Sequence, residues 1–217
     1  MNSQIAAILT MDGVATGAIY VLIALGFVLI FAVTRIIFVP FGDITAFTAL
    51  TLADLEAKRL PGTASMIAAL ALVAALMEVV ALLRSGGASR IPRALLYYLA
   101  LPLVPAAVVW ATAGIMLPAP LRIALTLMLI LPLAPLLDRI VFRPIADASV
   151  LLLLIVSVAL HFALVGMGLL FFGPEGVRTQ SLVDFSTDIA GTPVSGETLL
   201  IVGSAAFFSF LLYLFFN

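Results

Sequence analysis

Residues 149–172 read SVLLLLIVSVALHFALVGMGLLFF, and this stretch contains no charged side chain. About 20 predominantly apolar residues are enough for a helix to cross the hydrocarbon core of a bilayer. The whole chain has the same character, because 65% of its 217 residues are hydrophobic, 10% are charged and the mean hydropathy is +1.33. A soluble domain has about half of its residues apolar and about a quarter charged. The sequence therefore predicts an all-α, polytopic helical membrane protein.

Seven apolar segments have a length at or near that of a membrane span. We expect them at residues 14–33, 41–55, 62–83, 94–117, 121–137, 149–172 and 197–216. The second segment is unlike a complete crossing, because it is short and because Pro40 and Gly42 break regular hydrogen bonding where it begins. Irregular backbone at membrane depth persists only where protein or a watery cavity surrounds it. We therefore predict about seven spans with a short or broken second helix, in one transmembrane domain over residues 1–217.

Basic residues near the ends of the spans predict the orientation of the chain. Alternate connections carry Arg35, Arg84, Arg90, Arg93, Arg139 and Arg143, whereas the other set carries Lys58, Arg59, Arg122 and Arg178. Because basic loops tend to stay in the cytoplasm, we place the first set inside, the N-terminus outside and the C-terminus of this chain inside. Residues 173–197 then form an external loop, and TQSLVDFS, residues 179–186, has the alternation of a short hairpin.

The sequence carries no signal of an active site. It has no cysteine, which excludes disulfides, thiolate metal sites and cysteine nucleophiles. Its one histidine cannot form a metal site alone, and no HExxH, GxSxG or P-loop pattern is present. We therefore expect no enzymatic activity, no metal or cofactor, and no nucleic acid partner.

Asp43 is one of two acidic residues closest to the apolar interior. Burying a carboxylate in a bilayer costs at least ~2.5 kcal/mol on insertion scales, so such a residue often faces a pathway or a partner. Asp43 also follows a break in the chain and precedes a helical run, so it could instead be the N-cap of residues 44–55. Both interpretations stay open, and the pathway interpretation includes Gly42.

Two further ionisable residues lie within apolar spans. Glu78 is near the cytoplasmic end of its segment, where it could reach the interface or pair with Arg84. His161 lies in the middle of the uncharged stretch, and we expect it to form a hydrogen bond between helices in preference to a proton-linked role.

Two motifs favour structural roles. Gly13 and Gly17 are four residues apart in MDGVATGAIYVLIALGF, residues 11–27, a spacing that allows helices to pack closely. In DRIVFRP, residues 138–144, we expect a helix to leave the membrane at Asp138. Arg139 and Arg143 would then hold the loop in the cytoplasm and meet lipid phosphates, and Pro144 would turn the chain toward the next span.

Several stretches, taken in order, resemble one family, the LivH-like membrane permease subunits of branched-chain amino acid ABC transporters. DGVATGAIYVLIALGFVLIFAVTRII, residues 12–37, is similar to the opening helix of that family. FGDITAFTA, residues 41–49, resembles the short segment that opens its second helix, with Gly42 and Asp43 at the family's glycine and acid. Phe38 and Phe41 depart from the pattern, because asparagine and histidine or glutamine are usual there.

The strongest part of the resemblance lies in residues 138–176. The family's acid-arginine pair, Arg-Pro pair and Gly-Pro-acid group are matched in order and spacing, by Asp138, Arg139, Arg143, Pro144, Gly173, Pro174 and Glu175. Together the matching stretches cover residues 12–50 and 138–180, which is under half of the chain.

The resemblance implies a permease subunit of an ABC importer for branched-chain or related amino acids in a bacterial inner membrane. Its partners would be a second permease subunit, two cytoplasmic ATPase subunits that hydrolyse ATP, and a periplasmic substrate-binding protein. Gly42 and Asp43 would line the substrate pathway, with Gly13 and Gly17 packing around it. The binding protein would contact the external loop, at Gly173, Pro174, Glu175 and Arg178. The family continues past the helix that matches residues 197–216, so we expect the chain to be an N-terminal portion.

Two alternatives belong to other classes of protein. One is a self-sufficient secondary carrier or channel that uses Asp43, Glu78 or His161 for ion coupling. The other is a truncated remnant that inserts into the membrane and transports nothing.

Overall fold

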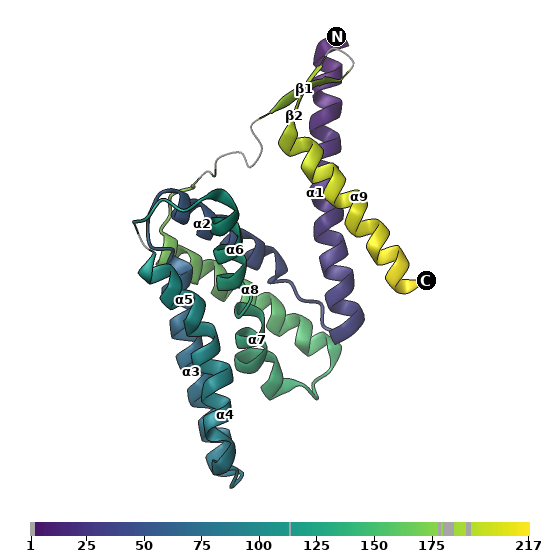
Figure 1. Cartoon of the computed structure of the whole chain (residues 1–217). Coiled ribbons are helices and arrows are strands. Elements are labelled where there is room, and N and C mark those ends of the chain that lie inside the picture. Colours follow the sequence, from purple (N-terminus) through teal and green to yellow (C-terminus); the bar gives the residue numbers. More distant parts are fainter. Residues whose placement is uncertain (1–2, 113, 178, 180–184, 190–191) are drawn as a thin grey trace. The chain divides into compact units, whose positions relative to one another are not determined.

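The computed structural model describes residues 3–112, 114–177, 179, 185–189 and 192–217, and these are almost entirely helical (Figure 1). Six helical segments are long and apolar enough to cross a membrane: Ile5–Thr34, Gly62–Arg84, Ala88–Ala111, Ala119–Ile145, Val150–Phe172 and Gly196–Phe216. This architecture confirms the predicted all-α polytopic membrane protein. Helix α2, Phe41–Glu56, has only 16 residues and is not among the six. The second segment is therefore short, as predicted.

Several predicted boundaries were wrong by a turn or more. The first helix, α1, is Ser3–Thr34 and not 14–33. The predicted span 94–117 is displaced, because the helical segment there begins at Ala88 and ends at Ala111. Gly114 follows with a positive φ of 80°, and Pro118 has an extended backbone, so the apolar residues between them do not continue the helix.

Prolines explain why two of the six segments change their helical type along their length. Ala88–Ala111 consists of η1 (Ala88–Arg90), α4 (Ile91–Leu95), π-helical η2 (Leu96–Ala100) and α5 (Leu101–Ala111). Ala119–Ile145 consists of α6 (Ala119–Ile130), α7 (Leu133–Leu137), π-helical η3 (Asp138–Phe142) and the 3-10 turn η4 (Arg143–Ile145). Pro102, Pro105, Pro132 and Pro135 lie within these segments. Proline has no backbone N–H to donate, so the hydrogen-bond register shifts around it.

The described chain divides into two compact units, Met1–Phe38 with Ser181–Asn217, and Val39–Gln180. We call them unit 1 and unit 2 and describe each by itself. The single domain that the sequence predicts stays a prediction.

Unit 1 pairs α1 with the last helix, α9 (Gly196–Phe216), and adds a small hairpin. Strands β1 (Ser186–Ile189) and β2 (Thr192–Ser195) are antiparallel, with Ser186 opposite Ser195. The hairpin predicted at residues 179–186 stays a prediction, because residues 180–184 of it lie outside the described part of the chain. The observed position follows from the start of α9, because the Ser195 side chain caps that helix and the Gly196 N–H donates to the Phe185 carbonyl.

Unit 2 has its core between α3 (Gly62–Arg84), α5, α6 and α7. Figure 1 shows α3 and the α4–α5 segment side by side and running in opposite directions. The face of α3 in the core is mostly alanine, which lets the neighbouring backbones come close, as is typical of helices packed within a membrane. The buried members are Ala64, Ile67, Ala71, Ala74, Ala106, Val109, Leu125, Leu129 and Leu136.

Two glycines of unit 2 make close contacts between helices. The packing role predicted for Gly13 and Gly17 in α1 stays a prediction, because unit 1 is described by itself. At Gly62 a Cβ would collide with the backbone carbonyl of Phe171, and at Gly168 it would lie 3.3 Å from the ring of Phe47.

Candidate functional site

The candidate site lies between α2 and α8 (Val150–Phe172), which run in parallel through unit 2. Three contacts at nearly constant sequence offset fix their register. The Val39 N–H donates to Ser157, Asp43 contacts His161, and the Phe47 ring packs over Gly168. Ser157 and His161 are the two polar side chains of α8 and are four residues apart, so they lie on one face of the helix.

The backbone immediately before α2 is irregular and is satisfied by α8. Residues 35–38 have no regular structure, and the N-cap residue Pro40 makes no side-chain capping bond. The Val39 N–H donates to Ser157 Oγ at 2.9 Å, and both Ser157 and Pro40 are buried. The hydroxyl of Ser157 therefore replaces the intrahelical acceptor that this amide lacks, which is the condition for irregular backbone at membrane depth.

Asp43 and His161 form the one ionisable contact between α2 and α8 among the described residues. Nδ1 of His161 lies 2.8 Å and 3.0 Å from the two carboxylate oxygens of Asp43. The Nδ1–H donates in this pair, because an ionised carboxylate only accepts. The Asp43 side chain is 12% exposed, whereas that of His161 is 37% exposed. The expected interhelical hydrogen bond of His161 is thus confirmed.

The N-cap interpretation of Asp43 was wrong. Asp43 is the third residue of α2, and its carboxylate turns to His161 and not to a backbone N–H of the first turn. A negative charge in the first turn still interacts favourably with the helix dipole. Asp43 therefore interacts with the start of its own helix and with the imidazole of His161.

This pair lies at mid-span. His161 has eleven residues of α8 on either side of it, between Val150 and Phe172. A helix of that length rises roughly 34 Å at 1.5 Å per residue, enough for one bilayer crossing. Helix α2 therefore begins beside the middle of a membrane-spanning helix, and its positive N-terminus and Asp43 both lie there.

A hollow of about 260 Å³ opens beside Asp43 and runs along the two helices. Its apolar walls come from α2 and α8, and its polar groups are Asp43 and Glu175. The loop residues Gly173, Pro174 and Gly176 complete the lining. A space of this size has room for several water molecules, each of which occupies about 30 Å³ in the liquid. The hollow connects the loop after α8 with the carboxylate at mid-span.

The hollow brings together two groups of residues that the sequence treated separately. Asp43 was predicted for the pathway, and Gly173, Pro174 and Glu175 were predicted for contact with a binding protein. Gly42 is exposed and does not line the hollow, and Arg178 lies outside the described residues.

A second polar cluster lies at the opposite end of α8, where the Ala119–Ile145 segment ends. Glu78 forms an ion pair with Arg139 and not with Arg84, which was one of the two possibilities that the sequence left open. The helical segment continues beyond Asp138 to Ile145, which brings Arg139 inward against α3. Arg139 is thus nearly buried and does not meet lipid phosphates as predicted.

The rest of the 138–144 motif keeps its expected turning role. Asp138 is exposed, and Arg143 donates from Nη1 to the Tyr98 hydroxyl at 2.7 Å. The chain turns after the 3-10 turn that contains Pro144, before Ser149 caps α8.

Sequence reasoning missed Ser157 and Tyr98. A signal for Ser157 was present, because it is the one hydroxyl residue of α8 and lies one turn before His161. Nothing in the sequence distinguished Tyr98 from its neighbour Tyr97.

No protein-family model, no curated protein and no solved structure matches this chain. The resemblance to LivH-like permeases therefore stays a prediction from the motifs.

Proposed function

We propose that this chain is a membrane-spanning permease subunit that moves branched-chain or related amino acids across the bacterial inner membrane. Separate ATPase subunits power the transport, and a second permease subunit and a periplasmic binding protein complete the importer. The solute class and these partners rest on the resemblance of the motifs.

The broken crossing at α2 is the observation that carries the proposal. Membrane transporters commonly place helix ends at mid-bilayer, where the exposed backbone and the dipole contact the solute. Here α2 begins beside the middle of α8, Asp43 stands in its first turn, and a hollow joins Asp43 to the loop containing Glu175. A zwitterionic amino acid presents an ammonium group that suits these two carboxylates and a carboxylate that suits the N-terminus of α2.

One observation favours a second candidate, a secondary carrier coupled to protons. His161 and Asp43 form a hydrogen-bonded acid–base pair at mid-span, and ionisable residues within membrane spans often belong to proton relays. Such a carrier needs no ATPase subunit.

An uptake experiment separates the two candidates. One set of proteoliposomes contains the chain alone, and a second set also contains the ATPase and permease partners. Labelled leucine and its binding protein are added outside both sets. If the chain is an importer subunit, uptake should require the partner subunits. It should also require ATP on the side of the membrane where the ATPase subunits lie. A pH gradient that drives uptake by the chain alone would establish the carrier instead.

The variants Asp43→Asn and Asp12→Asn sharpen the result. Asp12 is an exposed acid of α1, so its replacement serves as the matched control. Under either mechanism Asp43→Asn should reduce uptake by tenfold or more, about 1.4 kcal/mol, and Asp12→Asn should leave it unchanged. Equal uptake by wild type and Asp43→Asn would remove Asp43 from the pathway, and no uptake under any condition would favour the remnant.

A further inference from the structure

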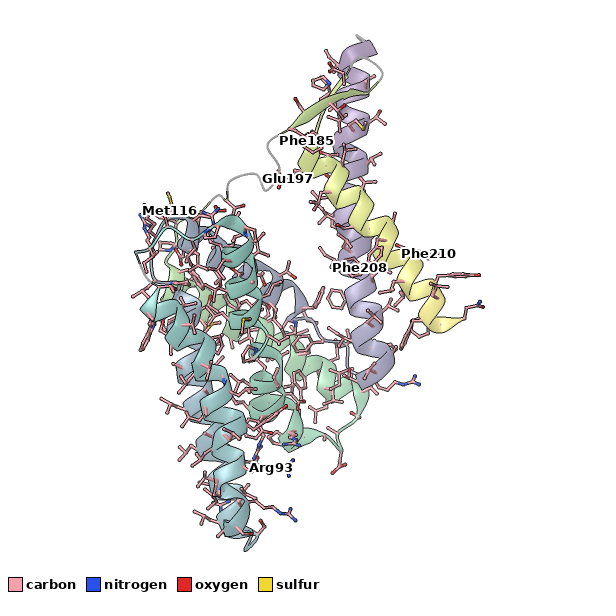
Figure 2. All side chains as sticks on the ribbon, in the orientation of Figure 1. Arg93, Met116, Phe185, Glu197, Phe208 and Phe210 are labelled. Atoms are coloured by element: carbon pink, nitrogen blue, oxygen red, sulfur yellow. The ribbon has the colours of Figure 1, made fainter. Side chains whose placement is uncertain are left out.

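A hollow of about 770 Å³ lies at the end of unit 2 where α3 and the Ala119–Ile145 segment both end. Arg84, Arg139 and Arg143 line it together with one acidic residue, Glu78. Three guanidinium groups against one carboxylate give the hollow a net positive charge of two. Figure 2 shows Arg93 toward one end of unit 2 and Met116 toward the other.

Two of the three arginines keep donors for a ligand. Arg139 is held by Glu78. Arg143 is exposed and gives one hydrogen bond to Tyr98, and guanidinium has five N–H donors. Arg84 is exposed and makes no hydrogen bond or ion pair with any described residue. Arg84 and Arg143 are therefore two guanidinium groups in one hollow with donors to spare.

The remaining walls of the hollow are apolar. Leu76, Met77 and Val80 line it from α3, and the side chains of Leu76 and Val80 are 66% and 38% exposed. They lie within the Gly62–Arg84 span, one or two turns before Arg84. A polar floor at the end of a span, continuous with an apolar wall inside it, matches a lipid headgroup joined to an acyl chain. A free phosphate would use only the polar floor.

We propose that this hollow is a binding site for an anionic phospholipid. Its phosphate lies between Arg84 and Arg143, and one acyl chain follows Leu76 and Val80 along α3. Guanidinium groups bind phosphate with two parallel hydrogen bonds, and basic pockets between membrane helices favour anionic headgroups. The Glu78–Arg139 pair forms the inner wall and keeps Arg139 from competing for the ligand. This site is independent of the proposed transport function.

Native mass spectrometry of the whole chain, purified in a mild detergent, tests the site. The protein is titrated with dioleoyl phosphatidylglycerol, with dioleoyl phosphatidylcholine and with inorganic phosphate. We compare wild type with Arg84→Gln/Arg143→Gln and with the matched control Arg90→Gln/Arg93→Gln, which removes two arginines outside the hollow. The site variant should bind phosphatidylglycerol about 25-fold more weakly, at roughly fivefold per basic residue, and the control should bind like wild type.

Each other outcome overturns the proposal. If both double variants lose the same affinity for phosphatidylglycerol, binding reflects general attraction to positive charge. If the two lipids bind equally well, the hollow does not distinguish their headgroups. Displacement of phosphatidylglycerol by millimolar inorganic phosphate would indicate a phosphate site and not a lipid site. If the double variant does not fold, Arg84→Gln alone decides, because Arg84 forms no hydrogen bond or ion pair with a described residue. It should bind phosphatidylglycerol about fivefold more weakly.

Discussion

Gly62 has the least room for a side chain among the described glycines. It begins α3 at the point where the chain passes the end of α8, and a Cβ there would lie 2.9 Å from the carbonyl carbon of Phe171. The obstacle is backbone, so it cannot move aside as a flexible side chain would.

Gly62→Ala should therefore destabilise the folded chain by about 1–3 kcal/mol. Thermal unfolding in detergent, followed by circular dichroism, measures the change. Gly17→Ala is the control, because a Cβ at Gly17 meets nothing within 4 Å and alanine is a better helix former. Unfolding of Gly62→Ala at the wild-type temperature would show that α3 and α8 are farther apart than described.

Asp54 is a carboxylate next to Gly62 and outside the six spans. Burial raises the pKa of the Asp54 carboxyl above its ordinary value of 3.8, against smaller lowering effects of the Gly62 N–H and of Arg59. Folded protein therefore keeps this proton at a pH where unfolded protein has released it. The contribution of Asp54 to stability is most favourable near and below pH 3.8, and it declines as the pH rises through the raised pKa.

Asp54→Asn should remove this decline. An asparagine oxygen can still accept from the Gly62 N–H but does not ionise. Unfolding temperatures measured from pH 4 to pH 7 should fall more in wild type than in Asp54→Asn, whereas the exposed-site variant Asp12→Asn should follow wild type. Parallel curves for wild type and Asp54→Asn would contradict the raised pKa.

At the scale of elements, α2 and α8 depend on each other. Helix α2 has 16 residues and no side-chain cap, so its start is held from outside, by Ser157 and His161. An isolated helix of this length is marginal in water, and in a membrane its unpaired amides would find no water to replace α8.

Ser157→Ala should consequently weaken the start of α2. It leaves the Val39 N–H without an acceptor in buried surroundings, at a cost of about 1–3 kcal/mol. Hydrogen exchange of the backbone amides in residues 39–44 should accelerate, while that of the α3 core stays unchanged.

Ser204→Ala in α9 is the matched control, since Ser204 makes no hydrogen bond with a described residue. Unchanged exchange in Ser157→Ala would mean that another group satisfies Val39.

At the scale of the whole molecule, the described residues form six helical segments long and apolar enough to cross a membrane, and α2 has 16 residues. The basic residues predict that the loops near Ser89 face the cytoplasm and that those near Met116 face outward.

Cysteine labelling tests this orientation directly, because the chain has no cysteine of its own. A membrane-impermeant maleimide added to intact cells with a permeable outer membrane should label Met116→Cys, and it should label Ser89→Cys only after lysis. Both positions are exposed. The opposite labelling pattern would invert the predicted orientation, and equal labelling would show a mixed topology.

The elements that the sequence predicted well are those set by composition alone. Uncharged runs such as residues 150–172 have one stable form in a bilayer, and Pro40 with Gly42 marked the break before α2. Helix ends were less predictable, because Gly114 and the prolines act through local geometry. The partners of Glu78 and Asp43 could not be predicted, since each comes from a helix many residues away. The pathway role of Asp43 stays a prediction.

Because α2 and α8 run in parallel in a fixed register, sliding α2 along α8 has a different energetic cost in each direction. A shift of one helical turn, about 5.4 Å, toward the beginning of α8 would place Asp43 beside Ser157, which can donate to it, and would leave the Val39 amide and the His161 imidazole without their present partners. A shift of one turn the other way would place Asp43 beside Val165, which cannot. An unpaired carboxylate costs far more in apolar surroundings than an unpaired amide. We therefore expect α2 to slide more easily toward the beginning of α8 than toward its end.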